Sequence, residues 1–129
     1  PPGILSVNEG TVMSLSPPGV RLFYDPRGHH ACAINELCWG LEEQGVPCQT
    51  VSCDEGGDAD TLSALAARSS TLRVGIGLSA AGEIALTHAQ LPADAPLATG
   101  HVTDSRDHLR TLGANAGQLV KVLPLSERN

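Results

Sequence analysis

The chain has 129 residues, of which 41% are hydrophobic and 17% charged, and its 8 Lys and Arg against 14 Asp and Glu give a formal net charge of -6. This length fits one domain whose core removes roughly two-thirds of the unfolded surface from water. Only 2% of the residues are aromatic, and the acidic balance repels phosphates, so the composition argues against nucleic-acid binding. No apolar run approaches the roughly 20 residues of a membrane helix, so we expect no membrane segment.

The four cysteines form no Cys-x-x-Cys pair, and two of them fall inside an apolar helical pattern. We therefore expect small, reduced, buried thiols in a cytoplasmic protein and no disulfide framework. They are Cys32, Cys38, Cys48 and Cys53.

Residues 1–12 have no helical or strand period, and they lack the basic and apolar regions of a signal peptide. Met13 is the single methionine of the chain. We interpret Met13 as the native start and residues 1–12 as translated upstream sequence or a remnant of cloning, which we expect to be disordered. Residues 13–129 then form a single domain.

In the first half of that domain, strand and helix patterns alternate. Residues 20–24 (VRLFY) predict a strand that ends in a turn at residues 25–28. A helix follows, with a stop at Gly45 and Pro47. Its apolar face is formed by Ala31, Ile34, Leu37, Cys38 and Leu41. Residues 46–53 alternate in polarity and predict a second strand.

The second half continues this order. An acidic loop at residues 54–58 leads into a helix with Asp58 or Asp60 as its N-cap and Leu62, Leu65 and Ala66 as its apolar face. Residues 72–78 (LRVGIGL) predict a buried third strand, residues 83–88 a fourth and residues 96–99 a short fifth. A last helix begins at Asp104, and Gly113 could interrupt it. Its expected buried residues are Leu109, Leu112, Ala116, Leu119 and Val120.

Strand, helix, strand, helix, strand is the pattern of βαβ units. Right-handed crossovers then place helices on both faces of the sheet. The sequence therefore predicts a three-layer α/β domain, Rossmann-like or flavodoxin-like, with a mostly parallel central sheet.

Two glycine-rich patterns point to enzyme chemistry, but neither has the right context. Gly75, Gly77 and Ala80 fit a Gly-x-Gly-x-x-Ala dinucleotide fingerprint, yet the glycines fall inside the third strand and a further strand follows, so close helix packing is the favoured interpretation. Ser79 misses the Gly-x-Ser-x-Gly nucleophile elbow by one residue. There is no phosphate-binding loop, since Lys121 is the single lysine.

Three candidate metal or cofactor motifs are also incomplete. His29, His30 and Cys32 could ligate zinc, but adjacent histidines do not point at one ion easily and no second ligand pair follows. The acidic residues 54–60 lack the spacing of a calcium loop. The corrinoid motif Asp-x-His-x-x-Gly is absent, because Arg27 occupies the histidine position after Asp25.

Glu42 and Glu43 lie in the last turn of the first helix, where the helix dipole disfavours anions. No cationic residue stands at positions 39–41 to offset them. Solvated surface glutamates are one interpretation. The other is that one carboxylate meets a cation from a partner, either a basic patch or a hard metal ion such as Mg²⁺.

Several stretches together resemble a known family. They are GLEEQGVP at 40–47, AARSS at 66–70, LPADAPL at 91–97, DS at 104–105, NA at 115–116 and LVK at 119–121. The chain resembles, from Met13 to its end, the small (β) subunit of the coenzyme B12-dependent glycerol and diol dehydratase reactivating factors, with the glycerol version the nearer.

The resemblance implies a partner protein and no catalytic or cofactor-binding residue on this chain. Family members pair with a large, Hsp70-like ATPase subunit, which binds ATP or ADP, in an α2β2 complex that releases damaged cobalamin from glycerol or diol dehydratase. The small subunit resembles the dehydratase β subunit and exchanges with it. The family has an interface Mg²⁺ site, whose single small-subunit ligand corresponds to Glu43. Localisation is cytoplasmic, with microcompartment association among diol relatives.

Two alternatives of other classes remain open at this point. One is a small nucleotide-dependent oxidoreductase that uses the turn at Gly75 and Gly77. The other is a dehydratase β subunit that itself holds cobalamin. Specific binding of a dinucleotide by the isolated chain would favour the oxidoreductase, and binding of cobalamin would favour the dehydratase β subunit.

Overall fold

The computed structural model describes residues 19–28 and 30–122. Residues 1–12, Met13 and His29 lie outside this range. The elements are, in chain order, β1 (Val20–Tyr24), the 3-10 turn η1 (Pro26–Gly28), α2 (Ala31–Glu43), β2 (Cys48–Ser52), α3 (Ala59–Ser69), β3 (Val74–Leu78), β4 (Glu83–His88), β5 (Ala98–His101) and α4 (Arg106–Val122).

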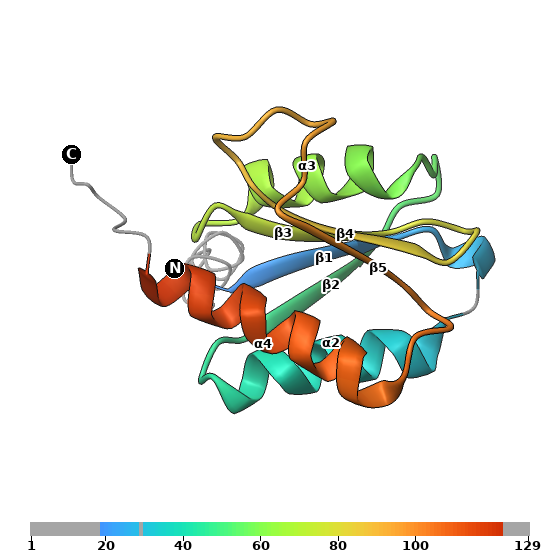
Figure 1. Ribbon diagram of the computed structural model, residues 1–129. Helices are drawn as coiled ribbons and strands as arrows, with labels where there is room; N and C mark the ends of the chain where they lie inside the picture. Colours follow the sequence, from blue (N-terminus) through green and yellow to red (C-terminus); the bar gives the residue numbers. More distant parts are fainter. Residues whose placement is uncertain (1–18, 29, 123–129) are drawn as a thin grey trace, which may run out of the picture.

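The strands form one sheet in the order β2-β1-β3-β4-β5, with α3 on one face and α2 and α4 on the other (Figure 1). The predicted three-layer α/β arrangement is therefore correct. Helix α2 connects β1 to β2, and α3 connects β2 to β3, so the first three strands are parallel.

The expectation of a mostly parallel sheet is wrong. Strand β4 runs antiparallel to β3, and β5 runs antiparallel to β4, so the sheet is mixed. The cause is the length of the connections. Four residues, 79–82, separate β3 from β4, whereas a parallel pair needs a crossover of about a dozen residues or more. Gly82, with φ of 94°, completes that tight turn.

Several local expectations need correction. Leu65 does not lie on the buried face of α3, since it is 44% exposed, while Leu62 and Ala66 are buried. The fifth strand begins two residues later than expected, at Ala98. Gly113 does not interrupt the last helix, which runs unbroken through it. The choice of N-cap for α3 is settled in favour of Asp58, whose side chain accepts a hydrogen bond from the Thr61 backbone N–H.

The main core lies between the sheet and the pair of helices α2 and α4. Val20, Leu22, Ile76, Leu37 and Leu112 are among its buried members. The four cysteines are free thiols, but the expectation that they are buried is wrong, since Cys32 is exposed and Cys38, Cys48 and Cys53 are half-buried. Among residues 19–28 and 30–122, no helix is both long and apolar enough to span a membrane.

Helices α2 and α4 approach each other closely because glycines face each other at the contact. A Cβ on Gly40 would lie 2.1 Å from the Arg110 carbonyl oxygen, and a Cβ on Gly113 would lie 2.1 Å from the Leu37 carbonyl oxygen. Both contacts are with backbone, which cannot move aside as a flexible side chain can. This contact brings the last turn of α2 beside the first half of α4, where the candidate site lies.

Candidate functional site

Glu42 and Glu43 both lie exposed in the last turn of α2, as expected. The Glu43 side chain is 54% exposed. No basic residue of α2 itself lies in that turn, so the helix provides no charge of its own to compensate the two carboxylates.

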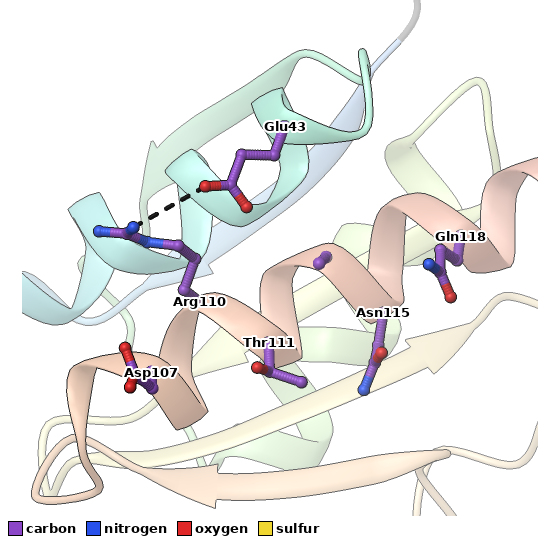
Figure 2. A pocket seen from close by; sticks show the side chains of 7 residues that line it. Glu43, Asp107, Arg110, Thr111, Asn115 and Gln118 are labelled. Atoms are coloured by element: carbon purple, nitrogen blue, oxygen red, sulfur yellow. Dashed lines mark ion pairs between the residues drawn. The ribbon is translucent and has the colours of Figure 1, made fainter.

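The neighbouring helix supplies the missing cation. Arg110 of α4 places its Nη1 3.8 Å from the Glu43 Oε2, as Figure 2 shows. The local sequence suggested an uncompensated pair, because positions 39–41 carry no positive charge. A cation from a distant part of the chain corrects that interpretation for Glu43. Both side chains are well exposed, so this ion pair contributes little to stability, about 0–1 kcal/mol.

Arg110 is held mainly by a residue that the sequence analysis did not single out. Glu36 of α2 is buried, and its Oε1 accepts hydrogen bonds from Arg110 Nε at 3.1 Å and from Nη2 at 3.0 Å. A signal for it existed, since Glu36 falls at helical spacing among the buried residues Ala33, Leu37 and Gly40. A carboxylate on an apolar helix face requires a charged partner.

Trp39, the single tryptophan of the chain, completes the cluster. Its ring lies over the Arg110 guanidinium, with 5.4 Å from Cζ to the ring centroid, and the residue is 49% exposed. Trp39, Glu42, Glu43 and Arg110 line an open hollow of about 400 Å³. We call these four residues the α2 end face.

A second hollow, of about 320 Å³, continues from Glu43 and Arg110 along α4. Its other side chains follow one face of that helix, as Figure 2 shows, and are polar except for Ala114. They are Asp107, Thr111, Ala114, Asn115 and Gln118. The region offers carboxylate, hydroxyl and amide groups, but no nucleophile paired with a base.

The glycine-rich motif of β3 has a structural role. Gly75 and Gly77 lie within the strand and face α3, where added Cβ atoms would meet backbone atoms of that helix at 2.2 Å and 2.3 Å. The interpretation as close helix packing is confirmed. His30, of the candidate zinc residues, has its Nε2 3.1 Å from the Ala80 carbonyl oxygen.

Asp25, at the end of β1, is a buried carboxylate with a structural partner. Arg27 donates to it from Nε at 2.9 Å, from Nη2 at 2.6 Å and from its backbone N–H at 3.0 Å. These hydrogen bonds, the side-chain ones first, lower the pKa of Asp25 from 3.8 to about 2. Asp25 therefore stays ionised and closes the turn after β1.

This pair predicts an acid-sensitive contribution to stability. A carboxyl group whose pKa is lower in the folded state stabilises the fold above its unfolded pKa, and the contribution is lost as pH falls through the folded value. The free energy of unfolding should therefore fall between about pH 4 and about pH 2, and Asp25→Asn should lack this part of the dependence. Urea titrations at several pH values measure it. Asp94→Asn, in an exposed loop, is the control that should keep the wild-type slope.

No group of three or more His, Cys, Asp or Glu side chains suited to a metal ion occurs within residues 19–28 and 30–122. Glu42 and Glu43 each present an exposed carboxylate, and Mg²⁺ is commonly bound through one or two protein carboxylates while it keeps several other oxygen ligands.

Comparison with known proteins places the chain in a family. Residues 17–126 match the model of the dehydratase medium subunit family. The chain is 63% identical over 115 residues to a Citrobacter freundii protein described as a probable glycerol dehydratase-reactivating factor small subunit, covering 89% of this chain and 98% of that one. It is 39% identical over 95 residues to the diol dehydratase-reactivating factor small subunit of Klebsiella michiganensis, covering 73% and 74%.

Two solved structures agree with these relatives. A glycerol dehydratase reactivase chain superposes with a TM-score of 0.82 at 89% identity, covering 88% of this chain and all of the other. A chain of diol dehydratase-reactivating factor complexed with ADP and Mg²⁺ superposes with a TM-score of 0.75 at 29% identity, covering 87% and 100%. The chain therefore belongs to the dehydratase medium subunit family and, within it, to the small subunits of the glycerol and diol dehydratase-reactivating factors.

Proposed function

We propose that this chain is a non-catalytic subunit that works in the cytoplasm by binding a large, Hsp70-like ATPase subunit in an α2β2 complex. The complex releases damaged cobalamin from glycerol or diol dehydratase, and the large subunit binds ATP and ADP. The observation that carries this proposal is the 63% identity to a reactivating-factor small subunit over 98% of its length.

We also propose that this chain exchanges places with the β subunit of the dehydratase. The matching family model supports this exchange, because it describes a subunit of a dehydratase and covers residues 17–126. A chain of this family would take the place of the dehydratase β subunit during the exchange. Nucleotide state can drive the exchange if it changes the affinity of the large subunit for this chain by a few kcal/mol.

We further propose that Glu43 contributes one ligand to a Mg²⁺ ion shared with the large subunit. The donor set fits, because Glu43 presents a well-exposed carboxylate oxygen and Mg²⁺ prefers oxygen ligands. A related reactivating factor is described as complexed with ADP and Mg²⁺. When bound, the ion would link acidic groups of the two chains, while Arg110 stays on Glu36 through its two shorter hydrogen bonds.

The test mixes this chain with the large subunit in Mg²⁺, with ADP and then with ATP, and measures complex composition and affinity. We expect a stoichiometric complex whose stability differs between the nucleotides. Glu43→Gln should weaken association at least tenfold, about 1.4 kcal/mol, in Mg²⁺. The difference from wild type should disappear when Mg²⁺ is chelated.

Glu42→Gln is the matched control, since it removes the same charge from the adjacent exposed position and should change affinity less than twofold. If both substitutions left the affinity for the large subunit nearly unchanged, Glu43 would not be a ligand of the proposed Mg²⁺ site. Stoichiometric cobalamin binding by the isolated chain would favour a dehydratase β subunit instead.

A further inference from the structure

Trp39 is exposed at the place where a partner would meet Glu43. Three large hydrophobic residues are strongly exposed within residues 19–28 and 30–122: Trp39 at 49%, Leu65 at 44% and Leu97 at 50%. Leu65 lies on α3, on the other face of the sheet, and Leu97 lies in the segment before β5. Trp39 alone shares a hollow with Glu43. Tryptophan and arginine are the residues most often found to dominate binding at protein interfaces.

The Arg110 side chain, which packs against the Trp39 ring, is already held in place in the free subunit. The Glu36 side chain is only 8% exposed and holds Arg110 by two hydrogen bonds, at 3.0 Å and 3.1 Å. Moving Arg110 away would leave a buried carboxylate without its cation, which is strongly unfavourable. The guanidinium is therefore kept in one position under the indole.

The same guanidinium also faces Glu43. Its Nη1 is 3.8 Å from the Glu43 Oε2, while its Nε and Nη2 bond to Glu36. One planar group thus contacts both an aromatic side chain and a carboxylate on the α2 end face. A lysine could not do this, because its ammonium is a point charge without the planar fork of arginine.

We propose that Trp39 is the anchor by which the large subunit docks on the α2 end face, and that Arg110, fixed by Glu36, is the positioning residue for both Trp39 and Glu43. The inference rests on the proposed function, since its occupant is the partner that shares the Glu43 ion. That partner would present an apolar recess for the indole beside oxygen ligands for the metal. Ordering these side chains in the free subunit reduces the entropy lost on binding.

The first experiment measures affinity for the large subunit in Mg²⁺ with Trp39→Ala. We expect a loss of tenfold or more. Leu65→Ala and Leu97→Ala remove exposed hydrophobic side chains of similar exposure elsewhere and should change affinity less than twofold. Equal effects of all three substitutions would overturn the proposal. Thermal unfolding of each variant establishes that the fold is intact.

The second experiment tests positioning by Arg110→Lys, which keeps the positive charge. We expect a fivefold to tenfold loss of affinity in the wild-type background and less than a twofold loss when Trp39→Ala and Glu43→Gln are already present. If Arg110→Lys instead lowered the affinity by the same factor in both backgrounds, Arg110 would act independently of Trp39 and Glu43. That result would overturn its positioning role. Arg106→Lys, exposed one turn earlier on α4, is the control and should have no effect.

The outcomes separate this inference from the function on which it rests. If complex formation depends on Glu43 but not on Trp39, the proposed function stands and Trp39 is not the docking anchor. If complex formation depends on Trp39 but not on Glu43, Trp39 remains the anchor and Glu43 is not a ligand of a shared metal ion. Failure of the wild-type chain to bind the large subunit overturns both.

Discussion

Gly113→Ala should destabilise the protein by about 3 kcal/mol, an unusually large effect for one added methyl group. The new Cβ would lie 2.1 Å from the Leu37 carbonyl oxygen, so α2 and α4 must move apart. The gain of about 1 kcal/mol from replacing glycine inside a helix cannot offset that overlap. Urea denaturation measures the change in the free energy of unfolding.

Gly117→Ala is the matched control on the same helix. Its Cβ would lie 2.7 Å from the Cβ of Gln44, the residue that caps the C-terminal end of α2, so the overlap is smaller than the 2.1 Å approach at Gly113 and does not involve helix backbone. The same gain of about 1 kcal/mol in helix propensity offsets part of that overlap, so we expect Gly117→Ala to destabilise the protein clearly less than Gly113→Ala. If the two variants were equally stable, the close helix contact would not limit substitution at Gly113.

The second large effect concerns the buried ion pair. Arg110→Met should cost about 3 kcal/mol, because Glu36 would remain buried without its cation. Arg110 is 40% exposed, so water can reach the vacated position and keeps the cost at the lower end of the range for buried pairs. The measurement is again chemical denaturation.

The double variant Glu36→Met/Arg110→Met tests the cause. Replacing both members of a buried pair by apolar residues is often neutral, so the double variant should recover stability to within about 1 kcal/mol of wild type. A double variant as unstable as Arg110→Met would mean that the arginine stabilises through packing with Trp39 instead of through its charge.

Much of the fold could be predicted because the relevant patterns are local. The strands at residues 20–24 and 83–88 and the helix from Ala31 lie where hydrophobic periodicity placed them. The orientation of β4 was predictable as well, since the four-residue connection before it is too short for a crossover. That error came from extending the βαβ pattern beyond the segment that contained helices.

The candidate site was less predictable, since its central contact is not local. Glu43 could be selected through the family resemblance, and Glu36 by its spacing among buried residues. Arg110 could not be paired with either, because 74 positions separate it from Glu36 and nothing in the periodicity of α4 indicates which α2 residue it meets. Gly113 was considered only as a point where the last helix could be interrupted, whereas its role is to let α2 approach.

The pairing of Glu36 with Arg110 has a consequence for synthesis of the protein. Arg110 lies in the last helix, so a chain still on the ribosome, or one cut short before α4, has the α2 glutamates but not the guanidinium that orders them. Only a finished and folded polypeptide presents the complete α2 end face. Assembly through this face would therefore select against truncated copies without any separate quality-control step.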